Sequence, residues 1–227
     1  LAGHLRMAST RYRVGVAAMQ LKKRGVEMKA DGEVLIIGKH GWDKELVEKY
    51  PVVIFDVCDD HVSGTSEYKA HYELMCGKAT HLTCNTPMMR YQLHKHTGRI
   101  ATLIPDPYER PEWAPSWGEG LLWYGHPSNL VDLLRVIPTL PEDAKLGVIS
   151  KMADYVPKEF EPLVVKWSPD AMDKGLRNCR MVIIPTGKSP CKSANRLVEA
   201  ARAGKFVVAQ PLPEYEQFSE WMWVGDI

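Results

Sequence analysis

Long apolar runs are missing from this sequence of 227 residues. None of its hydrophobic stretches approaches the roughly 20 residues needed to span a bilayer. The first ten residues also lack the charged and then apolar pattern of a signal peptide. Cysteine is scarce, since the chain has five cysteines and no C-x-x-C pair. The sequence therefore predicts a cytoplasmic protein with reduced thiols rather than a disulfide scaffold or a membrane protein.

The glycine fingerprints of two common nucleotide sites are absent as well. The chain contains neither G-x-x-x-x-G-K-[ST] nor G-x-G-x-x-G, so neither a P-loop nor a nicotinamide dinucleotide site is indicated. Metal-ligand spacings are also missing. Asp56, Asp59, Asp60 and His61 are close in sequence, but they lie at the end of an expected strand rather than on a helix, and no second histidine follows His61 at an i+4 offset. No metal and no resident cofactor are therefore predicted.

Acidic residues are absent from the first 26 positions, which hold six lysines and arginines. A basic segment of this kind could meet an anionic acceptor, including nucleic acid, or form a solvated helix face. The formal net charge of the whole chain is only +1. The composition therefore favours the solvated face over a nucleic-acid surface.

The rest of the composition is that of a globular protein, with 45% hydrophobic and 25% charged residues. Four prolines fall within residues 102–118, which indicates a linker. Strand and helix patterns alternate on both sides of it, which predicts an α/β fold with two parallel sheets. We therefore expect one domain over residues 1–106, a linker over 107–120 and a second domain over 121–227.

The periodicity of apolar residues sets the expected elements. In the first half, strands are expected at His4–Met7, Val34–Ile37, Val52–Val57, His81–Cys84 and Ile100–Ile104, and helices at Tyr12–Arg24, Trp42–Lys49, Tyr68–Met75 and Pro87–His96. In the second half, strands are expected at Leu121–Tyr124, Lys145–Ile149, Leu163–Lys166, Met181–Ile184 and Phe206–Ala209, and helices at Ser128–Ile137, Ala171–Cys179, Ala194–Ala203 and Glu214–Phe218.

The most informative stretch is Met181–Tyr215, which reads as strand, polar loop, helix and strand. In a parallel βαβ unit the loop after the first strand lies at the carboxyl edge of the sheet, where open α/β sheets bind ligands. Free N–H groups and the helix dipole favour an anion at the start of the helix. This loop and first turn carry Lys188, Lys192, Ser193, Asn195 and Arg196, and Glu199 lies one turn further on. The pattern indicates a diphosphate at the helix start and a sugar or ribose hydroxyl near the glutamate.

The run Glu199–Ala209, EAARAGKFVVA, resembles the donor-binding core of GT-B glycosyltransferases, which consist of two Rossmann-like domains facing a cleft. Retaining members carry a pair of glutamates, E-x7-E, whose first member would fall at Cys191, so the chain departs from the pattern there. Further similarity lies in Ser9–Arg13, in Val53–Asp60, in Ile104–Glu109 and in Leu121–His126. The resemblance implies a divergent, compact, hexosyltransferase-like member of the group 1 superfamily.

That resemblance implies a nucleotide-diphosphate sugar as co-substrate, an unidentified acceptor hydroxyl and no metal. Cations and helix N–H groups would stabilise the departing diphosphate. The donor-binding residues implied are Gly125, His126, Trp167, Lys188, Lys192, Ser193, Asn195, Arg196 and Glu199. For His126 and Trp167, a plain loop residue and a core residue are the competing interpretations.

The acceptor side is expected in the first domain, at Ser9, Arg11 and Arg13. Asp59 and His61, with Glu199 from the donor side, are the catalytic candidates, because clustered carboxylates beside an imidazole can tune a general base. The competing interpretation of the aspartates is a turn cap with ion pairs to Arg11 or Arg13. An anionic acceptor such as a hydroxymethylated pyrimidine in DNA is one alternative, and a nucleotide-binding module without turnover or a nucleotide-sugar epimerase are others.

Overall fold

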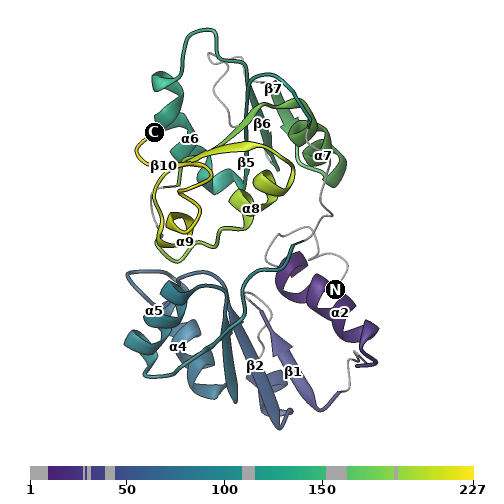
Figure 1. The fold of residues 1–227 in the computed structure, drawn as a ribbon. Coiled ribbons are helices and arrows are strands. Elements are labelled where there is room, and N and C mark those ends of the chain that lie inside the picture. Colours follow the sequence, from purple (N-terminus) through teal and green to yellow (C-terminus); the bar gives the residue numbers. More distant parts are fainter. Residues whose placement is uncertain are drawn as a thin grey trace. The chain divides into compact units, whose positions relative to one another are not determined.

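A computed structural model describes residues 10–27, 29, 32–38, 44–108, 116–151, 163–186 and 189–227 of the chain. The backbone divides into two compact units (Figure 1). The first unit comprises Leu1–Glu109 together with Pro190–Ser193, and the second comprises Arg110–Ser189 and Ala194–Ile227. Each unit holds one parallel sheet, which confirms the predicted α/β class. Ser9, Lys188 and the expected strand at His4–Met7 lie outside the described residues.

The first unit contains a four-stranded parallel sheet in the order β1-β2-β3-β4. Its strands are β1 (Val34–Ile37), β2 (Val52–Val57), β3 (His81–Cys84) and β4 (Thr102–Leu103), and its helices are η2 (Arg11–Val16), α2 (Ala17–Lys23), α3 (Lys44–Glu48), α4 (Lys69–Lys78) and α5 (Pro87–Thr97). The core forms where α4 and α5 pack on the sheet, with Phe55, Tyr72 and Met89 fully buried. Figure 1 draws α4 and α5 on one side of this sheet and α2 on the other.

The start and end of α5 show how local sequence sets an element. Thr86 precedes the helix, and its hydroxyl accepts a hydrogen bond of 3.0 Å from the Met89 N–H. Pro87 occupies the first turn, where its missing N–H costs nothing. Gly98 ends the helix with φ +71°, a conformation that favours glycine. These three residues fix the helix directly after β3 and so fix the loop at the carboxyl end of that strand.

The expected helix over Tyr12–Arg24 is found as two segments, the π-helix η2 and then α2. Gly15 and two valines, Val14 and Val16, fall in η2. Residues of these types have weak α-helical propensity, which permits the wider turn. Tyr12 is buried within η2, and Arg13 also points inward, with its side chain only 5% exposed.

The second unit contains a six-stranded parallel sheet in the order β10-β9-β8-β5-β6-β7. Its strands are β5 (Leu121–Gly125), β6 (Leu146–Ser150), β7 (Leu163–Lys166), β8 (Met181–Ile184), β9 (Phe206–Ala209) and β10 (Trp223–Val224). Its helices are η3 (Pro127–Asn129), α6 (Leu130–Val136), η4 (Ile137–Thr139), α7 (Pro169–Asn178), α8 (Asn195–Arg202) and α9 (Pro213–Glu216). The expected helix over Ser128–Ile137 therefore starts and ends in 3₁₀ turns, and β10 was not expected.

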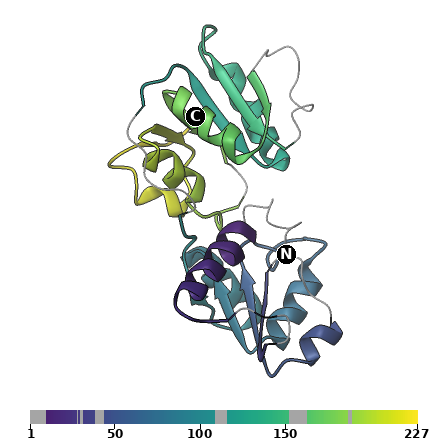
Figure 2. The same ribbon diagram turned by 90° about the vertical axis from the view of Figure 1, so that its right-hand side faces the viewer.

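Side chains of successive residues in β5 alternate between two cores of the second unit. Leu122 and Tyr124 belong to the larger core, with residues of α7, α8 and α9. Trp123 belongs to the smaller core, with residues of α6. Figure 2 shows α7 in green lying across the teal strands of this sheet. Helices therefore cover both faces of the sheet, as expected for a sheet built from parallel strands.

The chain order of the second sheet reverses direction at its centre. After β5 the chain goes to β6 and then β7 on one side, and after β8 it goes to β9 on the other side. Because β5 and β8 are neighbours, their carboxyl ends flank the switch point. In open α/β sheets, ligands bind in the crevice outside the strands at such a point.

Candidate functional site

The carboxyl ends of β5 and β8 bring an arginine and a glycine together in the second unit. The Tyr124 hydroxyl donates a hydrogen bond of 2.7 Å to the Arg196 carbonyl, and Arg196 Nη1 donates one of 3.3 Å to the Tyr124 carbonyl. A Cβ built on Gly125 would lie 3.2 Å from the same Nη1 and 3.0 Å from the Trp123 ring. Glycine at this position therefore allows the guanidinium to approach the strand end.

Arg196 lies in the first turn of α8, where helix N–H groups favour an anion. Ala194 occupies the N-cap position and has no side-chain acceptor for these N–H groups, although Asn195 Oδ1 accepts from the Arg196 N–H at 2.7 Å. No carboxylate among the described residues pairs with the Arg196 guanidinium, so most of its donors are available to a ligand. Positive charge and backbone donors thus meet at the switch point.

Thr186 is a further residue of this edge, which sequence reasoning had not singled out. It follows β8 by two residues and is 5% exposed, and its Oγ1 has no hydrogen-bond partner in the part of the chain that the structure describes. A buried hydroxyl without a partner is costly, and such positions are where a bound group can supply the missing bond. The signal in the sequence was a polar residue two positions after a buried strand.

Three other residues were predicted to bind the donor, and each has a different environment in the second unit. His126 caps η3, since its Nδ1 accepts from the Ser128 N–H at 3.3 Å. Trp167 is half-buried and packs against the larger core of the second unit. Glu199 is half-buried in α8. These three residues remain predictions as donor contacts.

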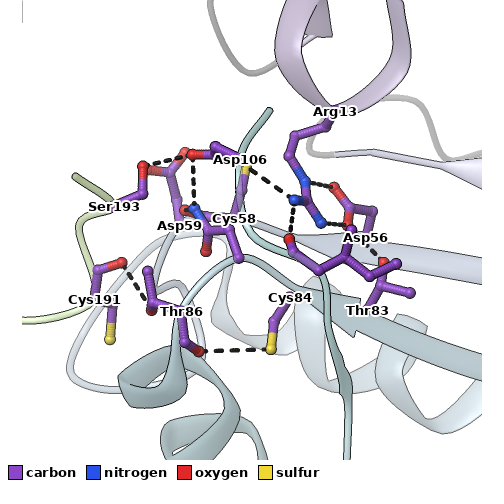
Figure 3. A network of polar contacts seen from close by, with 12 residues as sticks. Arg13, Asp56, Cys58, Asp59, Thr83, Cys84, Thr86, Asp106, Cys191 and Ser193 are labelled. Atoms are coloured by element: carbon purple, nitrogen blue, oxygen red, sulfur yellow. Dashed lines mark hydrogen bonds and ion pairs between the residues drawn. The ribbon is translucent and has the colours of Figure 1, made fainter. Parts of the chain in front are cut away.

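Lys192 and Ser193 belong instead to the first unit, where they meet two carboxylates. Lys192 Nζ lies 3.2 Å from Asp59 Oδ1. Ser193 Oγ donates a hydrogen bond of 2.5 Å to Asp106 Oδ2 (Figure 3). The loop that was expected to hold a phosphate is therefore partly bound by acidic side chains of the first unit.

The carboxyl edge of the first sheet carries a buried ion pair. Arg13 Nε donates to Asp56 Oδ2 at 2.9 Å and Nη2 to Asp56 Oδ1 at 2.5 Å, and Nη1 donates to the Ile104 carbonyl (Figure 3). The Thr83 hydroxyl donates to the same Asp56 at 2.5 Å. A guanidinium that is 5% exposed and enclosed in this way does not present its donors to a nucleic-acid phosphate. Arg11 is half-buried, and its guanidinium lies 5.7 Å from the centre of the Tyr12 ring.

The expected catalytic residues of the first unit have structural partners. His61 Nδ1 lies 2.9 Å from Ser66 Oγ, and its ring packs 4.7 Å from that of Tyr72. Asp60 accepts a hydrogen bond of 3.0 Å from the Ser63 N–H, which is a turn cap. Asp60 therefore caps a turn and Asp56 forms an ion pair, as the competing interpretation of the aspartates proposed. A catalytic role of Asp59 and His61 stays a prediction.

Asp106 and Asn85 complete this edge of the first sheet and were not among the predicted site residues. Asn85 Nδ2 donates to Asp106 Oδ2 at 3.5 Å, while the buried Asn85 Oδ1 has no partner among the described residues. Burial raises the pKa of Asp106, and the Ser193 hydrogen bond and the Arg13 charge oppose the increase. Asn85 directly follows β3, and Asp106 follows β4 by three residues. A polar residue near the end of an expected strand was the signal in the sequence for both.

The raised pKa of Asp106 predicts a pH effect on stability. Because the folded pKa lies above the unfolded value near 3.8, the contribution of Asp106 is most favourable below that value and is lost as pH rises through the folded pKa. Asp106→Asn cannot ionise, so its free energy of unfolding should rise relative to wild type as the pH increases above about 4. Urea unfolding at several pH values measures this difference. A difference that is constant with pH would contradict the prediction.

No helix among the described residues is both long and apolar enough to cross a membrane. The same residues contain no group of three or more His, Cys, Asp or Glu side chains placed to hold a metal ion.

No family model matches the chain, and no curated protein matches it either. Among solved structures, the chain is similar to a structure described as "Glycosylation Associate Protein (Gap123) complex" from Streptococcus agalactiae, with a TM-score of 0.44 and 12% sequence identity. The similarity covers 88% of this chain and 46% of that one, so the chain spans less than half the length of that structure's chain.

Proposed function

We propose that the second unit binds the diphosphate of a nucleotide sugar and that the protein is a glycosyltransferase. The observation that carries the proposal is the Arg196 guanidinium, which lies at the start of α8 beside Gly125 at the switch point of the sheet. Guanidinium groups bind phosphate oxygens in bidentate geometry, and helix N–H groups add further donors. A diphosphate has enough oxygen atoms to accept hydrogen bonds from the guanidinium and from the helix N–H groups at the same time.

The same arrangement suits the chemistry of sugar transfer. The bond between the anomeric carbon and the diphosphate oxygen breaks, a bond to the acceptor oxygen forms, and the hydroxyl proton leaves with a base. Negative charge then develops on the departing diphosphate. Positive groups that are already oriented toward it stabilise that charge without reorganisation, and this is a large contribution to catalysis. Arg196 and the first-turn N–H groups of α8 would supply it, so the mechanism needs no metal.

A nucleotide-binding module without turnover is the second candidate, and two observations favour it. Cys191, which stands where retaining relatives would have their first glutamate, is 1% exposed in the core of the first unit. Asp59, the expected base, is paired with Lys192. Mass spectrometry and chromatography after incubation with nucleotide sugars separate the candidates. Released or transferred sugar supports the enzyme, an altered sugar on the nucleotide supports an epimerase, and an unchanged donor supports the module.

Replacing Arg196 with alanine should weaken binding of a nucleoside diphosphate by about 1.5–3 kcal/mol, roughly 10- to 150-fold in Kd. Isothermal titration calorimetry with UDP, GDP and ADP measures the change. Arg135→Ala is the matched control, because Arg135 is an arginine of the same unit whose side chain is 62% exposed and lies 3.6 Å from Asp132. If none of these nucleotides binds the folded wild-type protein at millimolar concentration, the proposed function is wrong.

A further inference from the structure

The hydroxyl of Thr186 has a place in the second unit that its protein surroundings do not explain. The residue is 5% exposed, and its enclosed Oγ1 has no hydrogen-bond partner among the described residues. A buried hydroxyl without a partner has lost its bonds to water and gained none from the protein, so it destabilises the fold. Valine, with the same branched shape and no hydroxyl, would avoid that penalty. A threonine at this position therefore points to a partner from outside the chain.

The register of the second sheet places Thr186 at the switch point. The pairing of β5 with β8 sets Leu122 beside Val182. Four positions further along both segments, Thr186 comes level with His126, the residue directly after Gly125. This is the carboxyl edge of the sheet, between the two strands from which the chain continues in opposite directions. Thr186 therefore lies at the edge of the sheet where open α/β sheets bind ligands.

Neighbouring hydroxyls at the same edge are bonded within the second unit. The Tyr124 hydroxyl donates to the Arg196 carbonyl at 2.7 Å. The buried Ser150 hydroxyl donates to the Gly125 carbonyl at 3.2 Å. These two hydroxyls have a structural role, because each joins one element to its neighbour. The Thr186 hydroxyl has no such role among the described residues, and this contrast singles it out as a group that serves a ligand.

We infer that Thr186 is a further ligand-binding residue, whose hydroxyl donates a hydrogen bond to a phosphate oxygen of the nucleotide. The inference rests on the proposed function. Phosphate oxygens are charged acceptors, and hydrogen bonds to charged acceptors are stronger than those between neutral groups. Arg196 and the first-turn N–H groups of α8 supply positive charge, and Thr186 adds a neutral donor from the end of β8. Its hydroxyl turns about the single χ1 bond, so it can meet the ligand without backbone movement.

Replacing Thr186 with valine should change affinity and stability in opposite directions. Isothermal titration calorimetry with UDP, GDP and ADP should show Kd rising roughly 10-fold for the nucleotide that binds, because a hydrogen bond to a charged group is lost. The urea midpoint of the free protein should increase, because the unpartnered hydroxyl is gone. Thr186→Ser keeps the hydroxyl and should keep Kd within about 3-fold of wild type.

Thr139→Val is the matched control in the same unit. The Thr139 hydroxyl already donates to the Val136 carbonyl at 2.7 Å. Thr139 ends η4, which precedes β6, and β6 runs parallel to β5. The chain has therefore returned to the amino edge of the sheet at this point, away from the proposed phosphate site. Thr139→Val should leave Kd unchanged, and it should not raise the urea midpoint, because it removes a hydroxyl that has a partner.

The outcomes separate the role of Thr186 from the proposed function. Unchanged Kd in Thr186→Val, while Arg196→Ala weakens binding, overturns the role of Thr186 alone. A lower urea midpoint in Thr186→Val also overturns it, because the hydroxyl would then have a partner in the free protein. Equal losses of affinity in Thr186→Ser and Thr186→Val would mean that the hydroxyl is not the group that binds. Absence of nucleotide binding in the folded wild type overturns both proposals together.

Discussion

Replacing Arg13 with methionine is expected to lower the free energy of unfolding by about 3–5 kcal/mol, the cost of removing one member of a buried ion pair. The guanidinium is 5% exposed, and its loss leaves the Asp56 carboxylate, also enclosed, with the Thr83 hydroxyl as its remaining side-chain donor among the described residues. The Ile104 carbonyl also loses its side-chain donor. Methionine fills similar volume, so the change measures the lost charge and hydrogen bonds rather than a cavity.

Urea denaturation followed by circular dichroism measures this cost. Arg24→Met is the matched control, because Arg24 ends α2 in an exposed position and its replacement should change stability by less than about 0.5 kcal/mol. Combining Arg13→Met with Asp56→Leu should recover part of the loss, since no buried charge then remains unpaired. A loss below about 1 kcal/mol for Arg13→Met would show that the pair is exposed to solvent in solution.

The role of Arg13 illustrates what the sequence could and could not predict. Its place in a basic segment after Ser9 fitted both an acceptor site and an ion pair with the aspartates near the end of β2 and shortly after it, Asp56, Asp59 and Asp60. The ion pair is difficult to predict from the sequence because Arg13 and Asp56 are 43 positions apart. Only the burial of the guanidinium favours the ion pair, and burial of one side chain is not encoded in local periodicity.

Strands were the most predictable elements. Four-residue apolar runs such as Met181–Ile184 and Phe206–Ala209 gave the exact bounds of β8 and β9, since buried parallel strands read as continuous apolar segments. The two-residue strand β10 was missed, because Trp223–Val224 is too short to show any period. Its pairing with β9 is a tertiary contact.

The membership of Pro190–Ser193 in the first unit could not be predicted from the sequence. Cys191 and Thr86 are 105 positions apart, and Lys192 and Asp59 are 133 apart. The loop composition indicated a diphosphate near the start of α8, which stays a prediction, and it did not indicate that Lys192 and Ser193 would bond to carboxylates. The choice between a phosphate and an aspartate as the partner of a lysine depends on which element lies near it in the fold.

Lys205 provides the second large expected effect, although nothing in the Glu199–Ala209 run marked it as important. The residue is 5% exposed just before β9. Its Nζ donates to the Ser116 carbonyl at 2.6 Å, to Ser116 Oγ at 2.9 Å and to the Cys179 carbonyl at 2.9 Å. The Arg177 carbonyl lies at 3.4 Å. One ammonium group therefore satisfies the carbonyls of two segments of the second unit.

Packing around Lys205 leaves little room for the two segments to adjust. A Cβ on Gly118 would lie 2.0 Å from the Asn178 carbonyl oxygen, so the backbone near Ser116 already touches the end of α7. Water would have difficulty replacing the lost donors in so narrow a space. Lys205→Met keeps most of the side-chain length but leaves these carbonyls without their donor.

We expect Lys205→Met to lower the free energy of unfolding by about 2–4 kcal/mol, given that an unsatisfied buried acceptor costs about 1–3 kcal/mol. Lys174→Met on the exposed surface of α7 is the control and should have little effect. Hydrogen exchange should then show faster exchange of the Glu119 amide, which bonds to the Asn178 carbonyl, because that pairing depends on the clamped segment. Equal stability of the two lysine variants would mean that the fold does not need the ammonium to join Ser116 to the end of α7.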